Sequence, residues 1–341
     1  MIGSRFLLSF TTNSATKEYL FENINDGDQL CIFVKAVESG TGITAVSNEN
    51  CLKVYTVPVK WLQPYAASVL PDNTIDLKWS WNTDAEIKKA EIYSGTNNIN
   101  IKDLSGYSLN FPLNKTNSFN YSGKSPSASK IYFKIKTTDL CDVNEESLPV
   151  STIFLKGIAN QNKTNLISWD FNLPDYVEVE SFTLYKIING IETIESTVEQ
   201  DIRSIIDEVD IDNPEEEKIC YYLTARIQLK LSDSSVIEEI IRSNTICINQ
   251  FATLIFPNAL IPEGLNDEFK PLTVFAQNAT YYLAIFDRWG QKVYETTDIN
   301  KAWKGKKNND ALPAGLYVYI AKLVQPNGRV EEKKGEVMLI R

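Results

Sequence analysis

The sequence predicts an all-β protein built from consecutive β-sandwiches. Apolar residues recur at every second position in short runs such as Ile75–Trp81 and Leu316–Leu323, and this period of two is that of a strand with one buried face. Glycine, asparagine and aspartate separate the runs roughly every ten residues, which is a typical spacing of turns in such folds. No apolar run approaches the roughly 18–20 residues of a membrane-spanning helix.

A hairpin motif recurs within the first 250 residues. In one copy a strand opens at Cys31, and a second strand is entered through the sequence S-N-E-N-C, which ends at Cys51. In another copy Cys220 opens the strand, and S-N-T-I-C ends at Cys247. Residues 131–155 resemble the same hairpin but lack a cysteine at both of these framework positions. The loss of the two cysteines together is what a cross-linked pair predicts, so we expect the disulfides Cys31–Cys51 and Cys220–Cys247.

The cysteine pairs also indicate the compartment. Two copies of one spacing in small domains with modest cores favour an oxidising exterior, where disulfides persist. Buried unpaired thiols are the alternative. Cys141 has no counterpart in the other copies, and we expect a free thiol in a turn there.

Each repeat carries a tryptophan on an early strand, as at Trp79 and Trp169, ahead of the hairpin. This pattern indicates sandwiches of about 95 residues and resembles fibronectin type III modules. We expect Trp79 and Trp169 to fill cores and Trp81 to lie on the surface as a possible sugar-stacking aromatic. The boundaries define a first repeat that keeps only its last strands (residues 1–56), a second repeat (57–155), a third repeat (156–250) and a C-terminal domain (251–341).

The composition argues against catalysis and against several kinds of partner. The chain has no histidine, so it lacks the commonest general base and the commonest metal ligand. Its net charge of −10 disfavours nucleic acid and anionic membranes as partners, because both bind basic surfaces. We therefore expect no enzyme activity, no cofactor and no metal. The stretch 207–217 holds seven carboxylates, but its spacing matches no calcium loop, and we expect a solvated loop. Asn25–Asp28 is similarly expected to be a turn.

The last ninety residues have a different character. They contain no cysteine, and they carry 12 Lys and Arg against 10 Asp and Glu, whereas residues 1–250 carry 22 against 34. Their motifs run in the order P-N-A, G-x-N-D-x-F, F-x-R-W-G-Q-x-V-Y, W-x-G, L-P-x-G-x-Y-x-Y and a final G-x-V-x-L-I-R. The motif residues are Pro257, Asn258, Gly264, Asn266, Asp267, Phe269, Arg288, Trp289, Gly290, Trp303, Gly305, Pro313, Gly315, Tyr317, Gly335 and Arg341.

This series resembles the gliding motility-associated C-terminal domain, the type B sorting domain of the type IX secretion system. The resemblance implies a β-sandwich that the outer-membrane translocon barrel and its shuttle-type barrel protein recognise in the periplasm. The family usually has P-N-G-D-G-x-N-D, whereas Pro262–Asp267 lacks its Asn-Gly-Asp part. We expect the motif glycines and tryptophans to build the fold. Charged residues are better candidates for contacts, namely Arg288, Lys304, Lys306 and Lys307.

The resemblance implies the C-terminal region of an adhesin-like protein at the cell surface or outside the cell. The sandwiches would act as a stalk, and the last domain as the secretion signal. Two alternatives stay open: the non-catalytic end of a large secreted hydrolase, or a repeat that is itself a carbohydrate-binding module with a surface glycan as its target.

Overall fold

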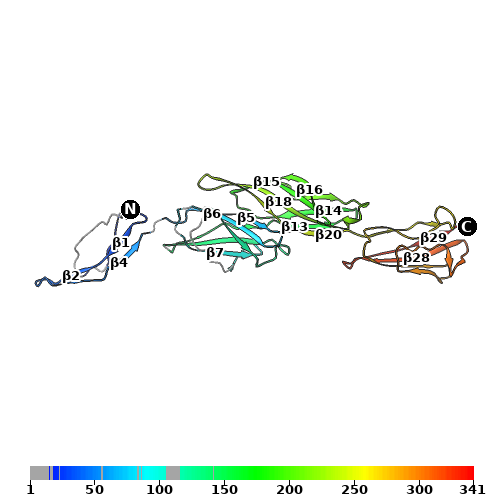
Figure 1. The fold of residues 1–341 in the computed structure, drawn as a ribbon, viewed down its shortest axis with the longest axis horizontal. Helices are drawn as coiled ribbons and strands as arrows, with labels where there is room; N and C mark the ends of the chain where they lie inside the picture. The colour runs from blue at the N-terminus through cyan, green and yellow to red at the C-terminus, as the bar shows by residue number, and fades with distance from the viewer. Residues whose placement is uncertain are drawn as a thin grey trace.

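The computed structural model describes residues 15, 18–22, 24–54, 57–82, 84–85, 87–104, 116–140 and 142–341. Regular structure in this part of the chain is almost entirely strand, which confirms the predicted all-β class. The only helical element among these residues is the short 3-10 turn η1 (Pro214–Glu217). No described helix is long and apolar enough to cross a membrane. The strands form bodies spread along one long axis, with strands β1 to β4 toward one end and the C-terminus at the other (Figure 1). Cys141 lies outside the described residues.

The described part of the first repeat is one hairpin made of two short strand pairs. Strand β1 (Gln29–Ile32) pairs with β4 (Asn50–Lys53), and β2 (Lys35–Val37) pairs with β3 (Thr44–Val46), all antiparallel. Cys31 lies directly opposite Cys51, and a disulfide joins them. None of the described residues between 18 and 54 is buried, so this hairpin presents both of its faces to the surroundings.

Asn25–Asp28 forms the turn that leads into β1, as its composition predicts. The side chain of Asp28 accepts a hydrogen bond from the Asn25 backbone N–H at 2.9 Å, and the Gly27 N–H donates to the Val54 carbonyl at 3.0 Å. Gly27 has a φ of 82°, a conformation that glycine adopts without steric cost.

The second repeat is a sandwich of two antiparallel sheets. One sheet has the order β5-β6-β9, and the other has the order β11-β10-β7-β8 with β12 also paired to β10. The strands are β5 (Leu62–Val69), β6 (Ile75–Trp81), β7 (Ile87–Gly95), β8 (Asp103–Leu104), β9 (Thr116–Tyr121), β10 (Tyr132–Asp139), β11 (Asn144–Glu146) and β12 (Val150–Ser151). Alternation along β10 is strict, because every second side chain from Phe133 onward is buried. Trp79 is fully buried in the core between the sheets.

The third repeat has the same arrangement of sheets. The order is β13-β14-β17 in one and β16-β15-β18-β19 in the other, with β20 also paired to β18. The strands are β13 (Phe154–Ala159), β14 (Thr164–Asp170), β15 (Val177–Ile188), β16 (Ile191–Glu199), β17 (Ser204–Glu208), β18 (Lys218–Lys230), β19 (Val236–Arg242) and β20 (Ile246–Asn249). Cys220 faces Cys247 in the β18–β20 pair, and a disulfide joins them. Trp169 is buried in this core.

The second and third repeats pack side by side rather than end to end (Figure 1). Strand β5 lies between them: Leu62, Ala67 and Val69 belong to the core of the second repeat, whereas Tyr65 and Ala66 belong to the core of the third. Every residue of β5 except one is buried. Both faces of β5 are therefore covered, one by the core of each repeat.

Polar contacts reinforce this joint. The Tyr176 hydroxyl donates to the Pro64 carbonyl at 2.8 Å, and the Arg242 backbone N–H donates to the Ser68 hydroxyl at 2.9 Å. Lys78 forms a half-buried ion pair with Glu239 at 2.8 Å. Burial raises the pKa of the Tyr65 phenol to about 12, with the Glu239 and Asp76 carboxylates adding to the shift. The contacts come from both repeats, so their relative orientation is fixed by specific groups.

The prediction for Trp81 was wrong. Its side chain is only 2% exposed, and it packs edge-on against Trp79 with ring centroids 6.1 Å apart. Residues two apart on a strand lie on the same face, so Trp81 follows Trp79 into the core. The same apolar cluster includes Leu173 of the third repeat, which helps to close this end of the sandwich. Trp81 is therefore no surface platform for a sugar.

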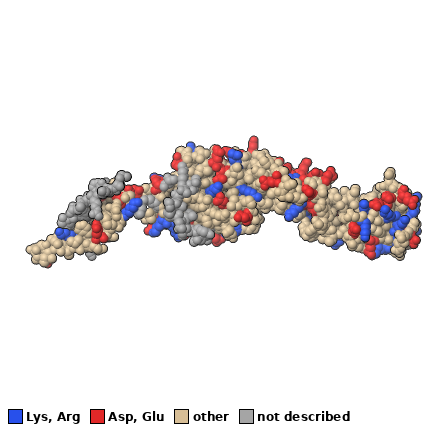
Figure 2. All heavy atoms as spheres, viewed as in Figure 1, with Lys and Arg blue, Asp and Glu red and all other residues tan. Residues whose placement is uncertain are grey.

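The C-terminal domain is a separate sandwich with its own core. Its main sheet has the order β22-β29-β28-β24-β25, accompanied by the pairs β21-β23 and β26-β27. The strands are β21 (Thr253–Ile255), β22 (Ala259–Leu260), β23 (Leu272–Val274), β24 (Thr280–Phe286), β25 (Lys292–Thr296), β26 (Lys306–Lys307), β27 (Asp310–Ala311), β28 (Gly315–Val324) and β29 (Val330–Leu339). Lys and Arg side chains are prominent on this domain at the right-hand end of the molecule (Figure 2).

The junction between the third repeat and the C-terminal domain is also held by side chains. The Gln325 amide accepts from the Ala252 N–H at 3.2 Å and donates to the Gln250 carbonyl at 3.0 Å. Lys163 donates to the Phe251 carbonyl at 2.6 Å. Phe275 of the C-terminal domain is 4% exposed and belongs to the core cluster of the third repeat. The linker is therefore ordered by contacts from both sides.

Candidate functional site

Aromatic motif residues form the interior of the C-terminal domain. Phe269 and Trp303 are almost fully buried, and their backbones exchange two hydrogen bonds of 2.9 and 3.0 Å. The Trp303 indole N–H donates to the Lys306 carbonyl at 3.1 Å, so its polar atom is satisfied inside the core. Tyr317 packs against Trp303 with ring centroids 5.0 Å apart and donates its hydroxyl proton to the Pro313 carbonyl. These residues fix the W-x-G loop onto the sheet.

The P-N-A motif and the last strand close the sheet together. Ala259 and Leu260 pair in parallel with Met338 and Leu339, and the Asn258 carbonyl accepts from the Met338 N–H at 2.9 Å. The final residue is held as well. The Arg341 guanidinium donates to the carbonyls of Leu312 at 2.8 Å and Gly305 at 3.2 Å. The end of the chain is thus part of the fold.

Two motif glycines are required by close approach. Gly305 has a φ of 70°, and a Cβ there would lie 2.8 Å from the Leu339 side chain. A Cβ on Gly335 would lie 2.6 Å from the Tyr319 hydroxyl. Both distances are shorter than a van der Waals contact, so these glycines allow the loop and the last strand to pack closely.

The loop with the shortened G-x-N-D element lies on the surface. The Ile261 N–H donates to the Asn266 carbonyl at 2.7 Å, and the Gly264 N–H donates to the Ile261 carbonyl at 3.0 Å, so backbone bonds alone close the turn. Leu265 projects fully into solvent. Asn266 and Asp267 are exposed, and they form no metal-binding group with other described residues.

The hairpin tip between β24 and β25 is rigid and exposes an aromatic ring. The Asp287 carboxylate accepts from the backbone N–H groups of Trp289 and Gln291, both at 2.9 Å, and Gly290 closes the turn with a φ of 81°. Trp289 is 81% exposed, and the Arg288 guanidinium lies 5.3 Å from the centre of its ring. The expectation that Trp289 builds the fold was wrong, because the turn places its side chain outside the core.

A second apolar feature lies on the outer face of the main sheet. The outer-sheet patch comprises Tyr282, Leu316, Val318, Ile320 and Met338, which are between 37% and 43% exposed. Leu316 lies opposite Met338 across the β28–β29 pair. A row of half-exposed apolar side chains on one sheet face is a typical feature of interaction surfaces.

The predicted basic contact residues lie near the W-x-G loop. Lys304 and Lys306 are exposed, and Lys307 is half-buried. Lys304 pairs with Glu268 at 3.2 Å, and Glu268 also pairs with Lys270 at 3.0 Å. Hydrogen bonds from these two lysines hold the pKa of the Glu268 carboxyl below its usual value. The basic side chains are therefore partly engaged with the surface loop rather than wholly free.

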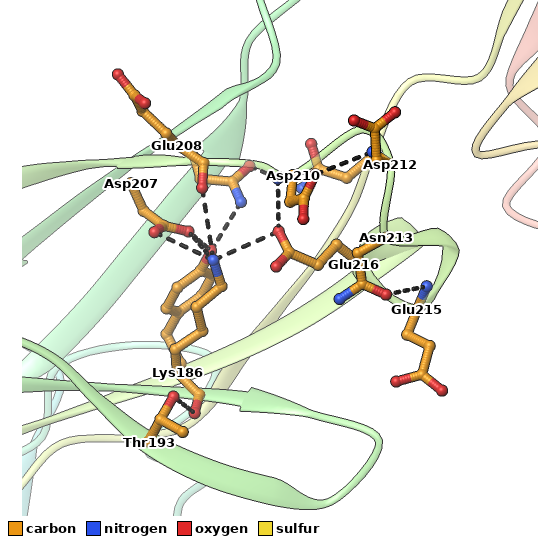
Figure 3. A network of polar contacts seen from close by, with 12 residues as sticks. Lys186, Thr193, Asp207, Glu208, Asp210, Asp212, Asn213, Glu215 and Glu216 are labelled. Atoms are coloured by element: carbon orange, nitrogen blue, oxygen red, sulfur yellow. Dashed lines mark hydrogen bonds and ion pairs between the residues drawn. The ribbon is translucent and has the colours of Figure 1, made fainter.

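The acidic stretch of the third repeat is not the fully solvated loop that we predicted. Asp207 and Glu216 are buried, and the Lys186 ammonium lies between them, 3.1 Å from Asp207 and 3.4 Å from Glu216 (Figure 3). The Tyr221 hydroxyl donates to Asp207, and the Asp210 N–H donates to Glu216 at 2.9 Å. Burial opposes the charge of Lys186, but the neighbouring carboxylates outweigh it and raise the lysine pKa.

The rest of the acidic stretch follows the prediction. Glu208, Asp210, Asp212 and Glu215 are exposed. Asn213 caps η1 by accepting from the Glu215 N–H. The partner of the buried carboxylates comes from strand β15, more than twenty residues away, so no local spacing could indicate it. The ammonium occupies the position between the two carboxylates that a bound cation would otherwise take.

Among the described residues, the one cluster of potential metal ligands is Cys31, Glu49 and Cys51. Its two sulfur atoms are joined in a disulfide, which removes them as thiolate ligands. The described residues thus offer the C-terminal domain's hairpin tip and outer-sheet patch as the features best suited to recognition.

A sandwich with the motif aromatics Phe269, Trp303 and Tyr317 in its core, one exposed tip and one apolar face defines a small folded recognition domain. Residues 254–339 match the family described as the CHU_C type IX secretion signal domain. Residues 254–339 therefore form a type IX secretion signal domain, preceded by antiparallel β-sandwiches. Such domains are non-catalytic in kind, and this signal implies export to the cell surface or the extracellular space. No curated protein matches the chain.

Three solved structures are similar to the chain at a coarse level. The FN1–FN3 domains of chicken CNTN1 match with 10% identity, covering 84% of this chain and all of that chain, at a TM-score of 0.21. Dimeric latent PorU from Porphyromonas gingivalis matches with 10% identity over 86% of this chain and 35% of that chain, at 0.21. Cadherin domains 3–6 of protocadherin gamma B2 match with 8% identity over 92% and 83%, at 0.24. Scores this low indicate no shared arrangement of whole chains.

Proposed function

We propose that the chain is the C-terminal region of an adhesin-like surface or secreted protein and that its last domain is read by the type IX machinery. The outer-membrane translocon barrel and its shuttle-type barrel protein are the proposed partners. The division near residues 56, 155 and 250 belongs to this proposal, with all of β13 (Phe154–Ala159) counted in the third repeat and with the second and third repeats serving as a stalk. The observation that carries it is the secretion signal domain folded as a separate body behind two packed sandwiches.

The hairpin tip and the outer-sheet patch are the proposed contacts for the machinery. Three of the motif aromatics, Phe269, Trp303 and Tyr317, are buried, and a buried side chain cannot touch a receptor. Trp289 and Arg288 combine an exposed ring with a charge, which is a composition that interfaces favour. The neighbouring apolar patch supplies area that becomes buried on docking.

The test is an export assay with a reporter that carries a signal peptide and residues 251–341, with and without the third repeat. The reporter is expected outside type IX-competent cells and in the periplasm of a translocon mutant. Deleting residues 254–341 from the full chain should leave it in the periplasm. Unchanged secretion of that deletion would contradict the proposal.

The contact surface is tested with substitutions in the same fusion. Trp289→Ala with Arg288→Ala, or Val318→Ser with Ile320→Ser, should reduce export several-fold while leaving the thermal unfolding of the domain unchanged. Leu272→Ala is the matched control, because Leu272 is also exposed, at 72%, but lies on the small β21–β23 sheet. Equal export of all three variants would exclude these surfaces.

A further inference from the structure

The hairpin of the first repeat carries an open groove. The groove has a volume of about 530 Å³ and is lined by Ile32, Phe33, Val34, Ser47, Asn48, Asn50 and Leu52. We propose that this groove is an acceptor for an extended β-strand of the kind that opens an immunoglobulin/fibronectin III-like repeat. The inference concerns the opposite end of the molecule from the secretion signal domain (Figure 1), and it does not depend on the proposed function.

The hairpin has a counterpart in the same chain whose backbone contacts match. The Ser47 N–H donates to the Val34 carbonyl, and the Val34 N–H donates to the Ser47 hydroxyl, both at 2.8 Å. In the third repeat, Ser243 makes the same two bonds with Leu223, also at 2.8 Å each. Because the disulfides sit at matching positions, Asn48 corresponds to Asn244.

In the third repeat the corresponding groove is filled by strand β13. The side-chain oxygen of Asn244 accepts from the Leu155 N–H at 2.7 Å, and its amide nitrogen donates to the Leu155 carbonyl at 3.0 Å. Leu155 and Ile248 are buried there. One asparagine side chain thus binds both the N–H and the carbonyl of a single strand residue. The contact depends on an extended backbone and not on a particular side chain.

Among the described residues, the first repeat has the same acceptor with no strand in it. Val34 is 66% exposed, whereas its counterpart Leu223 is fully buried, and Leu52 is 48% exposed, whereas its counterpart Ile248 is 5% exposed. Within the described part of the chain, the Asn48 side-chain amide has no hydrogen-bond partner. An apolar face next to an unused amide is what a strand-acceptor site requires, because main-chain bonds give affinity and apolar positions give specificity.

The chemistry of the occupant follows from β13. It is an extended segment with a large apolar residue at the Leu155 position and a small residue two positions later. Gly157 occupies that second position, and a Cβ there would lie 2.6 Å from the side chains of both Ile246 and Ile248. In the first repeat Asn50 replaces Ile246, so this end of the groove also accepts a polar neighbour.

The test uses the full chain and a fluorescein-labelled peptide of residues 151–160, measured by fluorescence anisotropy without reductant. Saturable binding is expected. Asn48→Ala should weaken it roughly 10- to 30-fold, because two backbone hydrogen bonds of about 1 kcal/mol each are lost. A peptide with Leu155→Asp should not bind. Glu49→Gln is the matched control, since Glu49 is exposed and adjacent but does not line the groove, and it should leave the affinity unchanged.

Hydrogen exchange locates the bound peptide. Added peptide should slow amide exchange within residues 29–53 and leave the third repeat unchanged. Equal peptide affinity of the unsubstituted chain, Asn48→Ala and Leu52→Asp would overturn the proposal, as would protection elsewhere in the chain. A dimer that protects residues 29–53 without any peptide would assign the groove to a second copy of the chain and would overturn the strand assignment.

Discussion

Replacing Lys186 by methionine should destabilise the third repeat strongly. The substitution keeps most of the side-chain volume but leaves Asp207 and Glu216 buried without their cation, and these side chains are only 1% and 8% exposed. Breaking a buried ion pair costs about 3–5 kcal/mol. Protonation limits the loss, because protonating an aspartate whose unfolded pKa is about 3.9 costs about 4 kcal/mol at pH 7. We therefore expect the free energy of unfolding to fall by about 3–4 kcal/mol.

The assay is hydrogen exchange of the full chain, read in peptides covering residues 204–230, together with thermal unfolding. A loss of this size corresponds to a midpoint lower by roughly 6–16 °C for a unit of 150–250 residues. Arg226→Met, on the neighbouring strand β18, is the control, because its ion pair with Glu180 is 3.9 Å long and its side chain is 54% exposed, so it should cost less than about 1 kcal/mol. A Lys186→Met loss no larger than this would refute the reasoning.

The pH dependence of the difference has a defined sign. In Lys186→Met one of the two buried carboxylates must take up a proton on folding. The loss of unfolding free energy relative to the unsubstituted protein should therefore shrink by about 1.4 kcal/mol per pH unit between pH 7 and 5. In the unsubstituted protein the carboxylates raise the pKa of Lys186 above its ordinary value of 10.5. A raised lysine pKa gives stability that is fully present below the unfolded pKa and is lost as the pH rises through the folded one.

Three further substitutions test the packing. Gly305→Ala should lower the stability of the C-terminal domain by about 1–3 kcal/mol in chemical denaturation, since alanine is strained at its positive φ; an unchanged midpoint would show that the loop adapts. Replacing Cys220 and Cys247 together by alanine should cost about 2–4 kcal/mol, the usual effect of a lost disulfide, and reductant should have no further effect on the third repeat of that variant. Asn244→Ala should cost about 2 kcal/mol because two buried backbone groups of Leu155 lose their partner, and hydrogen exchange at β13 should accelerate selectively.

Local patterns were sufficient for the features that depend on neighbours in sequence. Alternation and turn residues predicted the strands, and the repeated hairpin motif with its two cysteines predicted the pairing of Cys31 with Cys51. The motif series of the last ninety residues predicted the secretion signal domain. In each case the signal lies within one strand, one hairpin or one short series of motifs, where the periodicity of a strand determines which side chains share a face.

Features that depend on contacts between distant elements could not be predicted from the sequence. Nothing near Asp207 indicates that Lys186 neutralises it, because the two meet across the sandwich. Trp81 was misplaced by an error in strand alternation, and Trp289 was expected to build the fold although its turn directs it outward. Phe275 gives no local sign that it enters the core of the preceding repeat. The positions of Lys186 and Phe275 are decided by tertiary packing, which overrides local propensity, whereas the strand period places Trp81 in the core and the local turn places Trp289 outside it.

The position of strand β5 between two cores sets how far the array can reach. Sandwiches that lie alongside each other cover less distance per residue than sandwiches strung in single file. Bending at this joint would expose Tyr65 and Ala66 to water, so the pair should behave as one stiff block under load. The second and third repeats would then hold the C-terminal domain at a defined distance and angle from the first repeat, because bending is confined to the remaining linkers.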